Sequence, residues 1–429
     1  MTEKLLQFIW QLGYFNHAEL RVVSGEDIQI LDPGAFNNNQ GPDFLEAKIS
    51  IGSTIWVGHI EIHLLSSDWF RHAHDQDRNY GNVILHVVWE DDQPVKEMQF
   101  PLLVLQDRIP KLLLEKYEGW MDSRSFIPCE KNIRQINSST WYEWTSRLTL
   151  ERLNRKSNKL KEELAENNAH WEEICWWQIA ASFGNKVNTA AFEALAKTLP
   201  ILLLGRHKNQ IFQLEALLMG QGGLLDKEFL DEYPRQLKKE YLFLKTKYNL
   251  KPSYHSLHFL RMRPGNFPTL RLSQLANLIS QSLHLFSKIR EEKELKQIKS
   301  WLAVDSGNYW NTHYVPDEVS TFKIKSLGTQ VIESIIINAI IPMLFAYGSM
   351  HEENEYIEKA ISWLSEMGPE NNSIIEHWKR IGLNPQNASQ TQALLELKNL
   401  YCEKKRCLNC AIGETLLKNS MDEGSLIKC

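Results

Sequence analysis

Two neighbouring stretches of the chain decide its predicted fold, and they read NNNQGPDFLEAKI at residues 37–49 and WVGHIEIH at residues 56–63. Both alternate apolar with polar residues, which is typical of β-strands. Gly52 and Ser53 lie between the two stretches and are typical turn residues. We therefore expect two antiparallel strands joined by a tight turn.

The polar side chains of this hairpin are expected on one face. Successive residues of a strand point to opposite faces, so His59, Glu61 and His63 share a face and the isoleucines between them share the other. Counted outward from the turn, Asp43 lies near Glu61 and His63. Two carboxylates on adjacent strands suit a hard divalent cation, so Asp43 and Glu61 are predicted ligands of Mg²⁺ or Mn²⁺.

The same residues resemble the signature of the PD-(D/E)XK, or restriction-endonuclease-like, nuclease superfamily. Pro42 and Asp43 are followed, after seventeen residues, by Glu61-Ile62-His63. The resemblance implies a metal-dependent nuclease in which Asp43, Glu61 and His63 are catalytic. The departure is His63, which stands where the family pattern has lysine.

Further residues could belong to the same site. Glu19 follows a predicted N-terminal helix, in the region where the resemblance implies an additional acidic ligand, and His59 lies on the polar face of the hairpin. The alternative for the whole set is the polar outer face of an antiparallel sheet.

A segment rich in histidine and aspartate follows the hairpin. His72, His74 and Asp75 form a His-x-His-Asp pattern that could bind Zn²⁺ or another transition metal. Three interpretations remain open: a zinc-dependent hydrolase, the rim of the nuclease site, or a solvated loop.

Three cysteines near the C-terminus have metal-ligand spacing. Cys402, Cys407 and Cys410 form C-x4-C-x2-C, and Cys129 or Cys429 could supply a fourth thiolate. Such a set binds Zn²⁺ or an iron–sulfur cluster. Some PD-(D/E)XK nucleases hold a [4Fe–4S] cluster with one distant cysteine and three near the C-terminus, so the resemblance makes Cys129 the candidate of greater interest, although it follows the predicted nuclease core and does not precede it. Free thiols are the alternative.

The period of the apolar residues changes along the chain. Strand patterns dominate residues 1–125, whereas residues 126–429 follow a helical period in most segments. The predicted fold class is α/β plus all-α: an N-terminal restriction-endonuclease-like mixed sheet with helices, and then a large helical domain. The helical part carries Arg261, Arg263 and Arg271 around Pro and Gly, which suits phosphate contact, although pairing with acidic residues is equally compatible.

Charge and hydropathy indicate which partners and which location to expect for the protein. Residues 1–130 hold 10 Lys and Arg against 20 Asp and Glu, whereas the rest holds 38 against 33. An acidic front part suits cation binding and a mildly basic rear part is compatible with a polyanion. We see neither a signal peptide nor an apolar run of membrane-helix length, so the expected location is the cytoplasm, without membrane association. Protein partners are not indicated.

Over nearly its whole length the chain also resembles an uncharacterised bacterial domain-of-unknown-function family. The stretches that carry this resemblance include GPDF (41–44), GHIEIH (58–63), IPCEK (127–131) and YCEKKRCLNCAIG (401–413). Our leading hypothesis is a nuclease acting on DNA. The alternatives are a non-catalytic nucleic-acid or protein-binding scaffold that keeps a degenerate nuclease core, and the zinc-dependent hydrolase.

Overall fold

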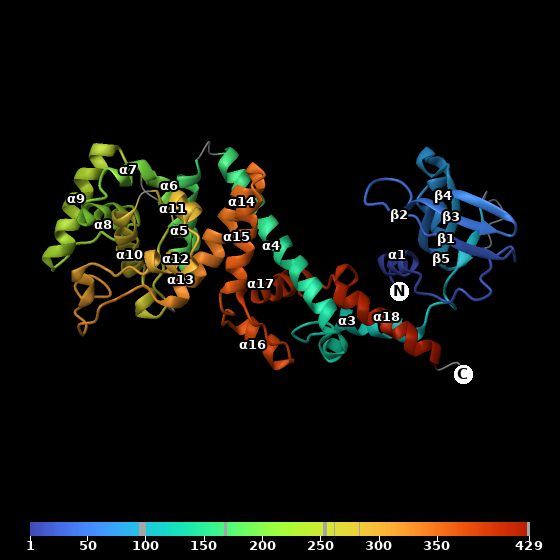
Figure 1. Ribbon diagram of the computed structural model, residues 1–429. Coiled ribbons are helices and arrows are strands. Elements are labelled where there is room, and N and C mark those ends of the chain that lie inside the picture. Colours follow the sequence, from blue (N-terminus) through green and yellow to red (C-terminus); the bar gives the residue numbers. More distant parts are fainter. Residues whose placement is uncertain (94–99, 167–169, 252–254, 261, 283, 427–429) are drawn as a thin grey trace. The chain divides into compact units, whose positions relative to one another are not determined.

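Two compact units make up the chain in the computed structural model. The structure describes residues 1–93, 100–166, 170–251, 255–260, 262–282 and 284–426. Unit 1 comprises Met1–Thr145, Asn372–Asn384 and Leu394–Cys429, and unit 2 comprises Ser146–Asn371 and Pro385–Ala393. The strands lie in the N-terminal part and helices make up most of the rest, as predicted (Figure 1). The domain boundary after residue 125 stays a prediction, since the contacts also group C-terminal residues with unit 1.

A six-stranded mixed sheet forms the N-terminal part of unit 1. Its order is β1-β3-β4-β5-β6, with β2 paired to β3. Neighbours β1, β3 and β4 are antiparallel, whereas β5 runs parallel to β4 and β6 parallel to β5. The strands are β1 (Ile28–Asp32), β2 (Ala35–Phe36), β3 (Phe44–Ile51), β4 (Thr54–Leu65), β5 (Val83–Glu90) and β6 (Leu102–Val104).

The predicted hairpin is confirmed, but its register contains a bulge. Ile51 faces Thr54 across the turn, and the ladder continues regularly to Ala47 opposite Gly58. Beyond that point one extra residue is accommodated, because Phe44 pairs with Ile60. Glu46 adopts a left-handed conformation with φ 57° inside this bulge. The bulge shifts the start of β3 by one residue against β4.

Helices complete unit 1 around and beyond the sheet. Helix α1 (Glu3–Leu12) begins where the Thr2 side chain accepts a hydrogen bond from the Leu5 N–H (3.3 Å), and it packs against β4. Near the C-terminus, α18 packs against α3 and η3, which joins distant parts of the chain. These and the remaining helical elements of unit 1 are α2 (Asp68–Arg71), η1 (His74–Gln76), η2 (Arg78–Tyr80), α3 (Lys111–Asp122), η3 (Glu130–Gln135), α16 (Ser373–Arg380), η7 (Leu397–Cys402), η8 (Cys407–Asn409) and α18 (Ala411–Leu426).

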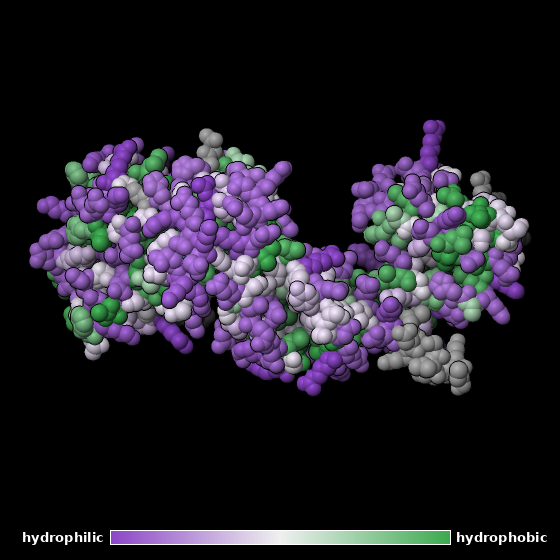
Figure 2. Space-filling model, in the orientation of Figure 1, coloured by the Kyte–Doolittle hydropathy of each residue, from purple (hydrophilic) through white to green (hydrophobic). Residues whose placement is uncertain are grey.

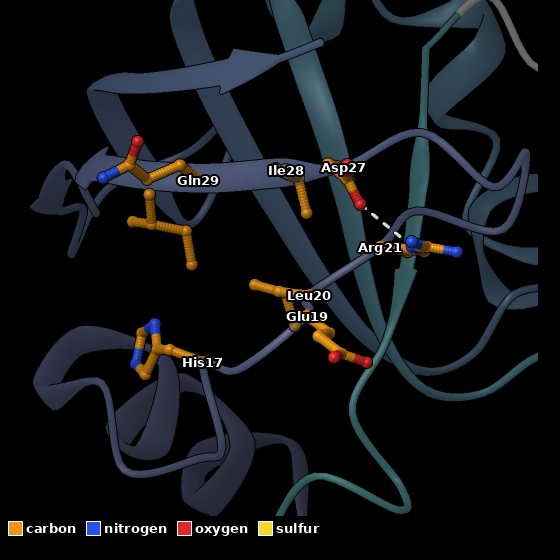
Figure 3. A pocket seen from close by; sticks show the side chains of 8 residues that line it. His17, Glu19, Leu20, Arg21, Asp27, Ile28 and Gln29 are labelled. Atoms are coloured by element: carbon orange, nitrogen blue, oxygen red, sulfur yellow. Dashed lines mark hydrogen bonds and ion pairs between the residues drawn. The ribbon is translucent and has the colours of Figure 1, made fainter.

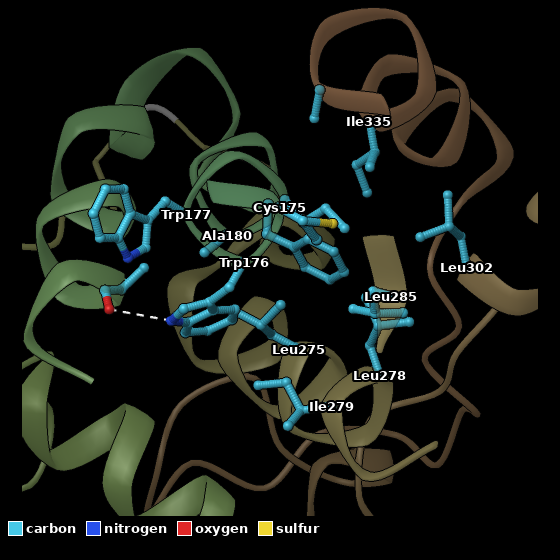
Figure 4. Packing of buried hydrophobic residues seen from close by; sticks show 14 of the residues in the cluster. Cys175, Trp176, Trp177, Ala180, Leu275, Leu278, Ile279, Leu285, Leu302 and Ile335 are labelled. Atoms are coloured by element: carbon cyan, nitrogen blue, oxygen red, sulfur yellow. Dashed lines mark hydrogen bonds between the residues drawn. The ribbon is translucent and has the colours of Figure 1, made fainter. Parts of the chain in front are cut away.

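Unit 2 is helical and has one large apolar core. Trp176 lies inside this core (Figure 4). Its indole N–H donates to the carbonyls of Ala196 (3.1 Å) and Leu199 (2.9 Å). Helix α4 (Ser138–Glu166) spans the division between the units. The other helical elements are α5 (Trp171–Phe183), α6 (Asn185–Thr198), α7 (Ile201–Gly205), α8 (Ile211–Gln221), α9 (Glu232–Tyr248), η4 (Pro264–Asn266), α10 (Pro268–Gln281), α11 (Leu285–Glu291), α12 (Leu295–Leu302), η5 (Asn308–Asn311), α13 (Thr329–Ile335), η6 (Ile336–Ile340), α14 (Ile341–His351), α15 (Asn354–Glu366) and α17 (Ala388–Glu396).

One helical segment differs from the expectation about hydropathy. The continuous run Thr329–His351 is long and apolar enough to cross a membrane by length and composition. Within its most apolar window, however, 78% is buried inside the protein, as is usual for a core helix. Hydrophilic side chains cover most of the molecular face shown in Figure 2.

The close contact between α8 and α9 gives a stability prediction. A Cβ atom added at Gly220 would lie 2.1 Å from the Tyr241 ring, so Gly220→Ala must displace a buried aromatic side chain. We expect a loss of about 1–3 kcal/mol, or more, in the free energy of unfolding. Chemical denaturation measures it. The control is Gly119→Ala in α3, where a Cβ meets nothing within 4 Å, and it should stabilise by about 0.5–1 kcal/mol. Equal stability of the Gly220→Ala variant and the wild type would refute the close packing.

Candidate metal centre

The carboxylates of Asp43 and Glu61 meet where β3 begins beside β4. The Asp43 backbone N–H donates to Glu61 Oε2 (3.0 Å), and the Ile62 backbone N–H donates to Asp43 Oδ2 (3.1 Å). With the bulge in place, the register of Phe44 opposite Ile60 extends to Asp43 opposite Glu61. The structure thus brings together the two carboxylates predicted as ligands.

Three histidines gather beside Glu61. His63, His72 and His74 each offer a ring nitrogen, and these three atoms all lie within 4.8 Å of one another. His72 Nδ1 is 3.2 Å from His63 Nε2. Glu61 Oε1 lies 3.5 Å from His63 Nε2 and 3.4 Å from His74 Nε2. The two carboxylates and the histidine segment therefore lie in a single cluster, in agreement with the interpretation of the segment as the rim of the carboxylate site.

Buried aromatic groups hold these imidazoles in place. His63 Nδ1 lies 2.8 Å from Nε2 of His86, which is itself buried on β5. The ring of His74 stacks on Tyr80 at 3.9 Å, and Trp69 packs edge-on against His74. A second group bonded to the outer ring nitrogen is what orients a metal-binding histidine. His63 is therefore arranged to present Nε2 to the cluster.

Helix α1 supplies two residues that the sequence did not single out. Gln7 Nε2 donates to Asp43 Oδ1 (2.9 Å) and lies 3.5 Å from Glu3 Oε1. The charge of Glu3 acts on both Asp43 and Glu61. The available signal was the one-turn spacing of Glu3 and Gln7, which places both on one face of the helix.

Burial controls the protonation of the cluster. It is the largest cause that raises the pKa of both Asp43 and Glu61, and the charge of Asp43 raises the pKa of Glu61 further. Burial also lowers the pKa of His63 to about 2, with the neighbouring imidazoles acting in the same direction, and it lowers the pKa of His74. The imidazoles are therefore neutral, as metal binding requires, and the two carboxyls ionise less readily than usual. A bound cation would stabilise the charged form of these carboxyls.

The arrangement has a donor set that could hold a transition metal. Three imidazole nitrogens can occupy three positions of a tetrahedral ion and leave the fourth open. His63 is 2% exposed, whereas His72 is exposed, so His72 is the member of the cluster that is most open to solvent. Since His63 is neutral and buried, it cannot supply the positive charge of the lysine in the PD-(D/E)XK pattern. Its geometry suits a ligand instead.

Other predicted site residues lie elsewhere or serve another purpose. Glu19 lines a separate cavity with His17 and Arg21 (Figure 3). The acidic residue whose charge acts on Asp43 and Glu61 is instead Glu3. The Glu46 backbone N–H donates to His59 Nδ1 (3.3 Å), which makes His59 a partner of the bulge. Asp75 is exposed in η1, and its charge acts on His74.

The predicted nucleic-acid-binding arginines differ in their surroundings. Arg261 lies outside the described residues, and Arg263 is exposed. Arg271 is only 3% exposed, and its guanidinium donates to Gln274 Oε1 (2.8 Å) and Asn266 Oδ1 (2.5 Å). The guanidinium of Arg271 is therefore not presented to a nucleic acid, because its role is to join α10 to the preceding turn.

The cysteines predicted as metal ligands are neighbours in unit 1. Cys129, Cys402, Cys407 and Cys410 line one cavity. Within the described residues, no three of their sulfur atoms all lie within 4.8 Å of one another, so they do not form a compact single-ion group. Cys429 lies outside the described residues.

Comparison with known proteins defines the family. Residues 3–373 match the model of a family described as "Protein of unknown function (DUF2851)". The chain belongs to the DUF2851 family. No curated protein and no solved structure matches the chain. Membership in DUF2851 confirms the predicted relationship to a family of unknown function, whereas no comparison supports the PD-(D/E)XK resemblance. The DUF2851 match includes the histidine cluster and ends before Cys402.

Proposed function

We propose that the protein is a metal-dependent hydrolase of phosphodiesters, in which His63, His72 and His74 hold a divalent transition metal. The observation that carries the proposal is the convergence of three imidazole nitrogens within 4.8 Å, with Glu61 Oε1 3.4–3.5 Å from two of them. Imidazole nitrogens with an adjacent carboxylate suit Zn²⁺. Mn²⁺ is the second candidate, because it prefers the carboxylate oxygens of the same cluster.

The residues around a bound ion would have different roles in hydrolysis. A bound ion supplies a nucleophile by lowering the pKa of its water toward about 7. Glu61 Oε1 is placed to accept the proton of that water, because it lies beside both His63 and His74. His86 and Tyr80 hold the imidazoles in position, and exposed His72 leaves an approach for the substrate.

The substrate class rests on the remaining carboxylates and on the Pro-Asp hairpin. Asp43 and Glu3 lie next to Glu61, and such a set suits a second, harder cation such as Mg²⁺ that contacts phosphate oxygens. The resemblance of Pro42-Asp43 and Glu61-Ile62-His63 to the PD-(D/E)XK signature implies a nucleic-acid phosphodiester, and DNA is our preferred substrate. Exposed Arg263 is a candidate for backbone contact.

The direct test is metal retention. We expect His74→Gln to weaken Zn²⁺ or Mn²⁺ binding by more than about 100-fold, because loss of a direct ligand should exceed the 10–100-fold effect of an outer partner. Elemental analysis and calorimetric titration measure it. The matched control is His17→Gln, an exposed histidine of the separate cavity, which should bind metal like the wild type.

An assay of substrate cleavage distinguishes the hydrolase from the alternative of a non-catalytic binding scaffold. Purified protein is incubated with plasmid, single-stranded DNA and a chromogenic phosphodiester in the presence of Zn²⁺, Mn²⁺ or Mg²⁺. Cleavage that His74→Gln abolishes and His17→Gln retains supports the hydrolase. Metal binding without turnover on any of these substrates would instead identify a non-catalytic protein with a retained metal site.

A further inference from the structure

A second candidate site lies in unit 1 where two distant parts of the chain meet. Cys129 comes from the segment before η3, and Cys402, Cys407 and Cys410 come from the connection between α17 and α18. All four line one cavity together with Arg406 and Gly413. The cavity surface contributed by these residues is apolar. This site uses no residue of the histidine cluster and is independent of the proposed hydrolase.

The backbone between η7 and α18 is shaped to turn three cysteines inward. Cys402 ends the π-helix η7, Cys407 begins η8, and Lys405 between them adopts a left-handed conformation with φ 50°. A π-helix within an α-helix is common at functional sites. A Cβ atom at Gly413 would lie 2.2 Å from the Cys407 carbonyl oxygen, so the close approach of α18 to η8 requires glycine there. Both features are local constraints that a simple helix-to-helix turn does not need.

The four cysteines are all free of disulfide bonds, and Cys129, Cys407 and Cys410 are buried. The backbone N–H groups of Gly413 and Ile412 donate hydrogen bonds to the Cys410 sulfur. N–H donors directed at a cysteine sulfur are a typical feature of iron–sulfur sites.

We propose that Cys129, Cys402, Cys407 and Cys410 hold a [4Fe–4S] cluster, with one thiolate on each iron. The spacing of the sulfur atoms favours a cluster over zinc. A tetrahedral Zn²⁺ with Zn–S bonds of about 2.3 Å brings its sulfur atoms to about 3.8 Å from one another. No three of these four sulfur atoms all lie within 4.8 Å. A cluster needs a wider set, because each sulfur binds a different iron.

Metal analysis of the full-length protein tests the cluster. The protein is purified without oxygen and, where iron is low, reconstituted with ferrous iron and sulfide. We expect about four irons and four labile sulfides per chain, with visible absorbance that dithionite bleaches. One zinc per chain without iron would overturn the assignment. So would a folded protein that takes up neither iron nor sulfide on reconstitution.

Variants assign the ligands. Cys402→Ser and Cys407→Ser should lose most of the iron and the visible absorbance, whereas Cys175→Ala should keep both, because Cys175 is buried in the apolar core of unit 2. Retention of four irons by either serine variant would remove that residue from the ligand set and overturn the four-cysteine site. If a serine variant does not fold, the iron and sulfide content of the wild-type protein still tests whether a cluster is bound. The His74→Gln variant should keep the cluster, which separates this proposal from the hydrolase.

Discussion

Glu61→Gln is expected to lower the rate of metal-dependent hydrolysis by about 10²–10⁴-fold, the usual contribution of a positioned general base. Glutamine keeps the size of the side chain and can still accept from the Asp43 N–H, but it cannot take a proton from water. The three imidazoles remain, so the ion should stay bound. Initial rates with a chromogenic phosphodiester at saturating Mn²⁺ or Zn²⁺ measure the loss, and elemental analysis measures the metal.

The matched control is Asp107→Asn, which makes the same chemical change at an exposed turn of unit 1. Its rate should equal that of the wild type. If Glu61→Gln kept the full rate while retaining its metal, Glu61 would not be the base. Loss of metal together with rate would make Glu61 a ligand, and thermal unfolding of the metal-free variant separates either result from misfolding.

Metal binding should tighten strongly as pH rises. In the metal-free protein, burial and the charge of Asp43 raise the pKa of Glu61 to about 9, so at pH 7 its carboxyl keeps a proton. A cation that binds beside Glu61 must displace this proton, which gives about a tenfold gain in apparent affinity per pH unit between about pH 6 and pH 9. Calorimetric titrations in buffers of different ionisation enthalpy count the released protons, and we expect about one per ion.

The sign of the stability effect follows from the same shift. An acid whose pKa is raised on folding stabilises the folded state below its ordinary pKa, and that contribution is lost as pH rises through the folded pKa. The contribution of Glu61 to the stability of the metal-free protein should therefore be lost between about pH 4.5, the ordinary value of its carboxyl, and about pH 9. This loss should set the direction above about pH 6.5, because the lowered pKa values of His63 and His86 make stability rise with pH only below that value. Bound metal should remove most of this loss. Above about pH 6.5, where Asp43 with its pKa of about 6 is largely ionised, Glu61→Gln should show neither the proton release nor the pH-dependent loss, and proton release from that variant in this range would contradict the assignment.

Local patterns were enough to predict the hairpin and the sharing of one strand face by Glu61 and His63. Alternation along a strand depends on the backbone alone, so it can be read without knowledge of neighbouring elements. The register between the two strands of the hairpin could not be predicted in the same way. The bulge at Glu46 moves Asp43 opposite Glu61, and no local pattern marks it, because its unpaired N–H is satisfied by His59 on the adjacent strand.

Some site residues could be found only after folding. Glu3 and Gln7 precede Asp43 by more than thirty residues and reach it because α1 packs against β4. Glu19, chosen for its place after that helix, lies in a different cavity. Sequence distance therefore misjudged which acid joins the cluster, because the direction of a helix relative to a sheet depends on packing.

By itself, the sequence determined a mixed N-terminal sheet followed by helices, the pairing of the Pro42-Asp43 strand with the Glu61 strand, and the residue types that could bind metal. Tertiary structure alone decided that His63, His72 and His74 share a site with the two carboxylates, and that Cys129 meets Cys402, Cys407 and Cys410. The physical reason is the distance along the chain over which each kind of interaction acts. Periodicity and turn chemistry act over a few residues, whereas a ligand set is assembled by packing between elements that lie far apart along the chain.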